Sequence, residues 1–186
     1  MTTKIYEVRF HGRGGQGAWT ASLLLAQAGL IEEKNIQSFP AFGPERAGAP
    51  ITAFTRISDE KIQLHSSIYE PDAVVVLDPT LLGPSVSEGV NEDTILLVNT
   101  EKSSKEVLDT LGLENIDTWT VDATTLAIDM LGRPITNTAM LGSIVKATGI
   151  VKLDSIVQVV KERFEGKIGE MNAELVKKAY EEVKQG

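Results

Sequence analysis

The sequence predicts an α/β fold, a three-layer α/β/α sandwich around a mixed but mainly parallel sheet, from three observations. Short β-branched runs alternate along the chain with longer segments of helical periodicity. Two of these runs, PDAVVVLD (71–78) and TILLVNT (94–100), are too continuously apolar for a half-exposed sheet, so we expect central parallel strands there. A glycine-rich loop separates the first run from the first helical segment, which predicts a Rossmann-like first βα unit.

The first βα unit is expected to begin with a strand over 4–11, where apolar and polar residues alternate imperfectly. A helix follows over 17–33, because an apolar stripe recurs there at helical spacing: Trp19, Leu23, Ala26 and Leu30. Its small residues allow close approach to a sheet: Ala18, Ala21, Ser22 and Ala28. NIQSF (35–39) predicts a second, short strand.

One segment interrupts the alternation of strands and helices. ITAFTRIS and IQLHSS (51–67) are two alternating runs around the polar turn DEK, which is typical of an antiparallel hairpin. A later strand is expected at 116–122 and helices at 103–111, 123–131, 137–148, 154–164 and 169–184. Because no internal repeat or long linker divides the chain, residues 1–186 are expected to form a single domain.

Composition excludes several classes of chemistry. Cysteine is absent, so this chain has no thiol nucleophile and cannot hold an iron–sulfur cluster through its own cysteines. Only His11 and His65 provide imidazoles, so a zinc site would also need several carboxylates, and neither histidine lies near a serine-containing elbow. The chain has no run of about 18 apolar residues and no apolar signal core at its start. We therefore expect a cytoplasmic protein that binds no membrane.

The charge is unevenly distributed along the chain. The formal net charge is −8; residues 1–66 carry seven Lys or Arg against six Asp or Glu, whereas residues 67–186 carry eleven against twenty. An acidic chain of this kind lacks the clustered cations that nucleic acids require, so DNA and RNA are not expected as partners. A bound anion is expected near the N-terminal third.

The loop HGRGGQG (11–17) is the first candidate site. Gly12, Gly14 and Gly17 match the spacing G-x-G-x-x-G between a strand and a helix, which favours NAD or FAD binding. However, the acid that holds the ribose in such proteins is missing at the end of the second expected strand, and a Walker-type Lys-Ser/Thr pair is also absent.

Two other interpretations of this loop stay open. The glycines can simply permit a tight turn and close packing of strand and helix. Alternatively, backbone N–H groups at the helix N-terminus, beside Arg13 and Gln16, receive an anionic group from a ligand or a partner chain. The candidate binding residues are Gly12, Arg13, Gly14, Gly15, Gln16 and Gly17.

The segment FPAFGPERAGAP (39–50) is a candidate interface, with Phe42, Glu45 and Arg46 as its contact residues. Exposed phenylalanines beside an ion pair on a proline-stiffened loop favour association. The alternatives are that Phe39 and Phe42 pack into the chain's own core, and that Glu45 and Arg46 form an ordinary surface pair. Because the sequence contains no recognisable complete set of catalytic residues, we expect the chain to be a component of a larger enzyme, without catalytic residues of its own.

Five ordered blocks together resemble the gamma subunits of 2-oxoacid:ferredoxin oxidoreductases, with the pyruvate branch nearest: HGRGGQG, FGPERAGAP, AFTRISDEKI, PDAVVVLD and RPITNTAMLG. The resemblance implies alpha, beta and delta subunits as partners and ferredoxin as the acceptor of the complex. It implies thiamine diphosphate on the alpha and beta subunits and [4Fe-4S] clusters on the beta and delta subunits. It also suggests that the chain lies near the CoA and thiamine sites and supports the conversion of pyruvate and CoA to acetyl-CoA and CO₂.

The resemblance has one departure and leaves alternatives. Family members often carry a second arginine after the first in the Glu-Arg block, where this chain has Ala47, so a contact through that second cation is in doubt. A branched-chain, 2-oxoglutarate or aryl glyoxylate enzyme of the same family is an alternative to the pyruvate enzyme. A free-standing nucleotide-binding α/β protein is the alternative from another class. The isolated chain is predicted to be inactive.

Overall fold

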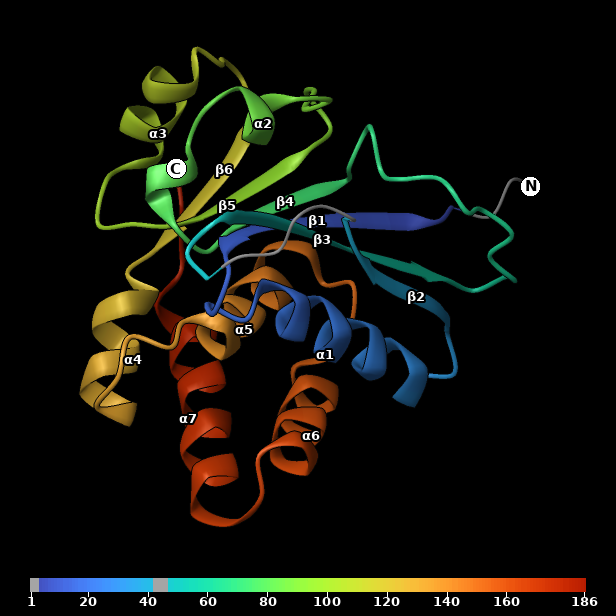
Figure 1. Ribbon diagram of the computed structural model, residues 1–186, viewed down its shortest axis with the longest axis vertical. Coiled ribbons are helices and arrows are strands. Elements are labelled where there is room, and N and C mark those ends of the chain that lie inside the picture. The colour runs from blue at the N-terminus through green and yellow to red at the C-terminus, as the bar shows by residue number, and fades with distance from the viewer. Residues whose placement is uncertain (1–3, 42–46) are drawn as a thin grey trace.

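A seven-stranded mixed sheet lies between two layers of helices in the computed structural model, which describes residues 4–41 and 47–186 (Figure 1). The elements are β1 (Tyr6–Arg13), α1 (Ala18–Ile31), β2 (Asn35–Pro40), β3 (Pro50–Ser58), β4 (Ala73–Val76), the 3₁₀ turn η1 (Pro79–Leu81), α2 (Pro84–Ser87), β5 (Ile95–Asn99), α3 (Ser104–Leu111), β6 (Asp117–Val121), α4 (Ala123–Leu131), α5 (Asn137–Thr148), α6 (Leu153–Arg163), α7 (Gly166–Glu182) and β7 (Lys184–Gln185). The predicted three-layer α/β/α class is confirmed.

The strand order is β2-β3-β1-β4-β5-β6-β7. Strands β1, β4, β5 and β6 are parallel, whereas β3 runs antiparallel to both β1 and β2, and β7 runs antiparallel to β6. After β1 the chain forms α1, β2 and β3, and β3 pairs with one edge of β1. The next strand, β4, pairs with the other edge of β1. The carboxyl ends of β1 and β4 therefore meet at a switch point, where open α/β sheets bind ligands.

The central strands are buried on both faces, as predicted for 71–78 and 94–100. Towards α1, α5 and α7, the sheet presents Val8, Phe10, Val75 and Leu97. Towards the smaller layer of α2 and α3, it presents Val74, Val76, Leu96 and Val98. All four residues of β4 are fully buried. This two-sided burial explains why the strand has no polar alternation.

The predicted hairpin over 51–67 is wrong in its second half. The first run forms β3, but residues 59–67 form no strand. Strand β3 is already paired with β1 along one edge and with β2 along the other, so neither edge is open to the run 62–67. The antiparallel component of the sheet therefore comes from β3 between β1 and β2, and from the short strand β7, which the sequence did not predict.

Helix α1 packs on the sheet through its small residues, as expected. Ser22 Oγ donates to the Phe54 carbonyl of β3 over 2.7 Å, and a Cβ on Gly29 would lie 3.2 Å from Ile36 and Ile57. The predicted apolar stripe faces outward instead, except for the buried Ala26: its exposed fractions are 50% for Trp19, 38% for Leu23 and 59% for Leu30. Leu24 and Leu25 of the same helix are fully buried, whereas Trp19, Leu23 and Leu30 lie on its outer face.

Candidate functional site

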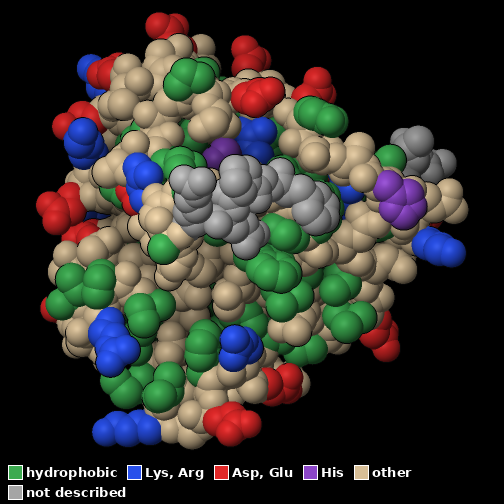
Figure 2. All heavy atoms as spheres, in the orientation of Figure 1, with side chains coloured by type: hydrophobic (Ala, Val, Ile, Leu, Met, Phe, Trp, Pro, Cys, Tyr) green, Lys and Arg blue, Asp and Glu red, His purple; other side chains and the backbone are tan. Residues whose placement is uncertain are grey.

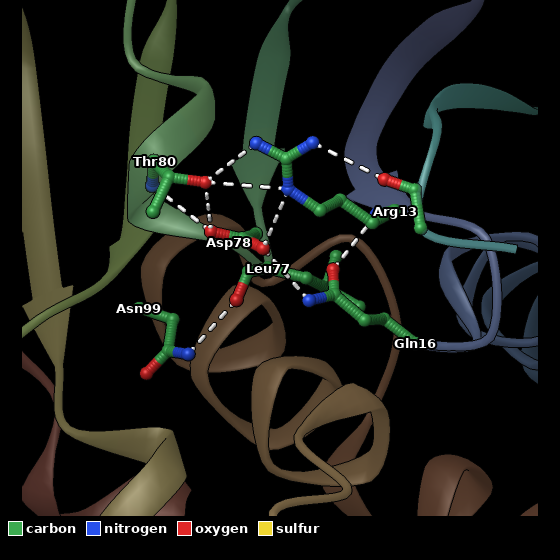
Figure 3. A network of polar contacts seen from close by, with 7 residues as sticks. Arg13, Gln16, Leu77, Asp78, Thr80 and Asn99 are labelled. Carbon is green, nitrogen blue, oxygen red and sulfur yellow. Dashed lines mark hydrogen bonds and ion pairs between the residues drawn. The ribbon is translucent and has the colours of Figure 1, made fainter.

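The glycine loop lies at the switch point between β1 and β4 and leads directly into α1 (Figure 3). Gly15 and Gly17 have φ angles of +95° and +79°, a region that side chains other than glycine rarely adopt. Gly14 N donates to the Ala49 carbonyl over 2.9 Å, and Gly48 N donates to the Gly14 carbonyl over 3.0 Å. The loop is thus fastened to the segment that precedes β3.

Arg13 points away from the N-terminus of α1 and towards the residues that follow β4 (Figure 3). Its Nε donates to Asp78 Oδ2 over 3.1 Å, and its Nη2 donates to Thr80 Oγ1 over 2.8 Å. Its Nη1 donates to the Gly48 carbonyl over 3.2 Å. The guanidinium predicted to hold an anion is therefore already bound within the chain.

Gln16 is the second predicted site residue with a partner inside the chain. Its Oε1 accepts from Arg13 N over 2.7 Å, and its Nε2 donates to Asp78 Oδ2 over 2.8 Å. Burial alone would raise the pKa of Asp78, but hydrogen bonds from Thr80 and Gln16 and the charge of Arg13 lower it overall. Asp78 is therefore a carboxylate that organises the loop. Its only signal in the sequence is an Asp-Pro step at the end of a strand.

The N-terminus of α1 remains open. Its N-cap residue, Gly17, has no side chain to cap the helix, and the N–H groups of residues 18–20 have no hydrogen-bond acceptor among the described residues. Asn137, at the start of α5, faces this turn: its amide nitrogen lies 2.5 Å from where a Cβ on Gly17 would be. Asn137 is only 5% exposed, and its Oδ1 accepts from Thr138 N over 2.9 Å.

A cavity of about 570 Å³ opens beside this helix end. We call it the α1 pocket; its lining residues are Gly15, Gln16, Gly17, Thr20, Leu131, Arg133, Ile135, Asn137, Arg163, Phe164, Ile168, Met171 and Asn172. The lining includes two arginines and no acidic residue, although the chain as a whole carries a net charge of −8. Of these lining residues, the sequence predicted only Gly15, Gln16 and Gly17 as binding residues.

The predicted interface residues Phe42, Glu45 and Arg46 lie outside the described residues. A second cavity, of about 350 Å³, adjoins the residues that flank them, because Ala41 and Ala47 line it together with Trp19 of α1. Phe39, which belongs to β2, stacks on Phe54 of β3 with ring centroids 5.1 Å apart. This contact supports the alternative that Phe39 packs within the chain.

The two histidines lie in different surroundings. His11 is a residue of β1 and is 4% exposed; burial, with the positive charge of Arg9 as the second cause, lowers its pKa to about 3. His65 is exposed, in the segment after β3. Over the described ranges 4–41 and 47–186, no three acidic or histidine side chains cluster as potential metal ligands. None of the helices in those ranges has the length and apolar character needed to span a lipid bilayer.

Comparisons with known proteins extend over nearly the whole chain. The family model described as pyruvate ferredoxin/flavodoxin oxidoreductase matches residues 7–182. The chain is 54% identical to the common gamma subunit of pyruvate/ketoisovalerate oxidoreductases from Pyrococcus furiosus, over 94% of this chain and 95% of that one. It is 49% identical to the pyruvate synthase subunit PorC from Methanothermobacter marburgensis, over 96% and 97% of the two chains.

A solved structure agrees with these relatives. The crystal structure of the pyruvate oxidoreductase subunit PORC from Thermotoga maritima matches with a TM-score of 0.90 and 44% identity, and it covers 98% of this chain and 99% of that one. The two chains therefore share a fold over nearly their whole lengths. On its sequence and its fold, this chain belongs to the pyruvate ferredoxin/flavodoxin oxidoreductase family.

Proposed function

We propose that the chain is the gamma subunit of a multi-subunit pyruvate:ferredoxin oxidoreductase, which converts pyruvate, CoA and oxidised ferredoxin to acetyl-CoA, CO₂ and reduced ferredoxin. The observation that carries this proposal is the similarity to gamma subunits over at least 94% of the chain. The absence of cysteine from the sequence supports it, because the clusters that reduce ferredoxin must then be held by other chains. We propose that this complex acts in the cytoplasm.

A branched-chain 2-oxoacid is the second candidate substrate. The relative from Pyrococcus furiosus is named as a gamma subunit common to pyruvate and ketoisovalerate oxidoreductases. One gamma subunit therefore serves two oxoacids in that organism, which supports a division of labour in which other subunits select the oxoacid. Pyruvate is the first choice because the relatives from Methanothermobacter marburgensis and Thermotoga maritima are named for pyruvate alone.

The outer face of α1 supports a role in assembly with alpha, beta and delta subunits. Trp19, Leu23 and Leu30 lie on one side of this helix and are between 38% and 59% exposed. Figure 2 shows hydrophobic side chains gathered over α1 and the neighbouring helices. Such a contiguous apolar face is unfavourable in water and is typical of a subunit contact. We propose that another subunit of the oxidoreductase covers it, together with the segment of Phe42, Glu45 and Arg46.

The glycine loop is proposed to lie beside CoA. Residues 12–17 are at the switch point where ligands of open α/β sheets bind, and they lead to an uncapped helix N-terminus that favours phosphate. Thiamine diphosphate and the [4Fe-4S] clusters belong to the other subunits in this proposal. The chain itself contributes a surface for CoA and for assembly.

The function is tested by activity of the complex assembled on this chain. The tagged chain is expressed in its own host, the complex is purified without oxygen, and reduction of a viologen dye is followed with CoA and either pyruvate or ketoisovalerate. We expect pyruvate- and CoA-dependent reduction by the complex and none by the chain alone. Greater activity with ketoisovalerate would favour the branched-chain enzyme, and dye reduction by the chain alone would contradict the proposal.

A further inference from the structure

We propose that a cavity on the face of the sheet opposite α1 binds a carboxylate, and that Arg9 and His11 of β1 are the residues that hold it. The cavity has a volume of about 200 Å³. We call it the Arg9 cavity, and its lining includes Arg9, His11, Phe54, Ser67, Ile68 and Tyr69. Among the described residues, none of 12–31, which include the glycine loop and α1, lines it. The inference therefore goes beyond the proposed function.

The position of Arg9 and His11 in the sheet separates this cavity from the glycine loop. Both residues belong to β1, where they are in register with Val74 and Val76 of the parallel strand β4. Residues in register on neighbouring strands point to the same face of a sheet. Val74 and Val76 pack towards α2 and α3, so Arg9 and His11 lie on that face as well.

Arg9 is a buried cation with incomplete hydrogen bonding. It is 5% exposed, and among the described residues only its Nη2 donates, to the carbonyls of Val86 over 2.9 Å and Glu88 over 2.6 Å. Its Nε is buried and has no hydrogen-bond partner there. The side chain of Glu88 is exposed and forms no ion pair with Arg9. A buried guanidinium without a counter-charge is unfavourable, so an anion beside it would stabilise it.

His11 is a second buried group without a partner at the same cavity. It is 4% exposed, and its Nε2 is buried with no hydrogen-bond partner among the described residues. The neutral ring that its lowered pKa favours carries one N–H, which can donate to an oxygen of a ligand. A negatively charged acceptor between the two side chains would therefore satisfy both Arg9 and His11.

The donors of the cavity suit a carboxylate better than a phosphate. Arginine binds phosphate through two parallel N–H groups, and each such pair on a guanidinium includes Nη2. Nη2 of Arg9 already donates to two carbonyls. A doubly charged phosphate would also lie beside Glu88, which lines the cavity. A carboxylate carries only one negative charge, and its oxygens can accept from single donors.

The size and the wall of the cavity select a short ligand. Phe54 and Ile68 line it and are 5% and 3% exposed, and Ala41 adds a methyl group. Side chains of this kind pack against a short alkyl group beside the carboxylate. Pockets for larger organic ligands begin at about 300 Å³, which exceeds the volume of this cavity. The ligand is therefore a short-chain monocarboxylate or the end of an acidic side chain.

A carboxylate can reach the cavity from two sources. Tyr69, Ser85 and Glu88 line it and are exposed, so the cavity opens to the surface of the chain. A free short-chain acid can enter from solvent. An acidic side chain of another subunit can enter when the chain assembles. Both sources present the same chemistry to Arg9 and His11, and they are separated by measurements on the free chain and on the complex.

The first test uses the full chain by itself. The chain is labelled with ¹⁵N, and the Arg9 Nε–H signal is followed by NMR while acetate is added at constant ionic strength. We expect a saturable shift with a dissociation constant on the order of millimolar, and none with acetamide, the uncharged analogue. Because Arg9 also holds the end of α2, the variant is made at His11: His11→Phe keeps a ring and removes the donor. It should weaken acetate binding by about tenfold.

The control and the contradicting results are as specific. Lys105→Ala removes an exposed cation from α3 and should leave the affinity for acetate within about twofold. No saturable shift up to about 100 mM acetate would overturn the inference. Equal shifts with acetate and acetamide, or equal affinities of the natural chain and His11→Phe, would overturn it too, because water would then fill the cavity.

The second test identifies the source of the carboxylate. Saturation transfer to the methyl protons of acetate is measured in complexes purified on the natural chain and on His11→Phe. A weaker signal in the His11→Phe complex identifies a free acid as the ligand. Equal signals, from a chain that binds acetate when free, identify a carboxylate of another subunit as the occupant. A chain that binds acetate through His11 but assembles no oxidoreductase supports the cavity and contradicts only the proposed function.

Discussion

Arg13, the last residue of β1, forms an ion pair with Asp78, which lies just after β4: Arg13 Nε donates to Asp78 Oδ2 over 3.1 Å. The same carboxylate oxygen accepts from Gln16 Nε2 over 2.8 Å (Figure 3). Two segments 62 to 65 residues apart in the sequence are thereby held together at the switch point. Arg13 therefore stabilises the fold, although it lies in the glycine loop.

The first prediction concerns the stability that Arg13 provides. Arg13→Ala removes the cation from Asp78 and the link to Gly48, so we expect the free energy of unfolding to fall by about 1 to 2 kcal/mol. Denaturant unfolding of the isolated chain measures this change. Lys105→Ala should be nearly neutral by comparison, and an equal effect of the two variants would show that Arg13 is not a structural residue.

The second prediction concerns pH and His11. Burial and Arg9 lower the pKa of His11 to about 3, whereas an unfolded histidine titrates near 6.5. Below about pH 6.5, His11 is therefore protonated in the unfolded chain, whereas it stays neutral in the folded chain down to about pH 3. The free energy of unfolding has its full value above about pH 6.5. On acidification towards pH 3 it falls by up to about 1.4 kcal/mol per pH unit.

Unfolding measured between pH 4.5 and 7.5 tests this assignment. His11→Gln should remove most of the slope that histidine contributes, and the exposed His65 provides the control, because His65→Gln should retain the slope. An unchanged slope in the His11 variant would show that the side chain titrates normally.

The third prediction compares two glycines of the loop. Gly15 and Gly17 both have positive φ, so alanine strains the backbone at either position. A Cβ at position 15 meets nothing within 4 Å, whereas one at position 17 meets the Asn137 amide at 2.5 Å. Gly17→Ala should therefore destabilise the chain more than Gly15→Ala, by about 1 kcal/mol or more. Equal melting temperatures would mean that Asn137 does not pack against the loop.

Local patterns were sufficient to predict the central strands and the glycine loop. Val74, Val75 and Val76 are buried on both faces of the sheet, and this environment imposes the unbroken apolar run that the sequence shows. Part of the glycine pattern is also local, because Gly15 and Gly17 adopt positive φ angles that favour glycine. The failure of the hairpin has a non-local cause: whether the run 62–67 pairs depends on β1 and β2 occupying both edges of β3.

The rest of the site required the folded chain. Asp78, the partner of Arg13, is 65 residues away in the sequence, and Arg133 and Arg163 reach the pocket from the ends of α4 and α6. Short-range periodicity carries no information about such contacts. It also could not decide which side of α1 faces the sheet, because small and large apolar residues alternate around that helix.

The fourth prediction concerns assembly. Leu30 is 59% exposed on the outer face of α1, so Leu30→Ser should leave the melting temperature of the isolated chain nearly unchanged while it weakens the complex. Arg46→Ala is expected to act in the same way through the segment of Phe42 and Glu45. Ile128→Ser on α4, at 48% exposure, is the matched control and should leave the complex intact. Co-purification from extract measures the effect; retention of the partners in both Leu30→Ser and Arg46→Ala would contradict the assigned contacts.

The most direct test of the central claim is purification of the natural chain from an oxygen-free cell extract, followed by mass identification and iron analysis of the proteins that accompany it. The account predicts that alpha, beta and delta subunits of an oxidoreductase accompany the chain, with thiamine diphosphate and iron in the purified material. Recovery of the chain alone, free of iron and able to bind NAD or FAD by itself, would contradict the account and favour a free-standing nucleotide-binding protein.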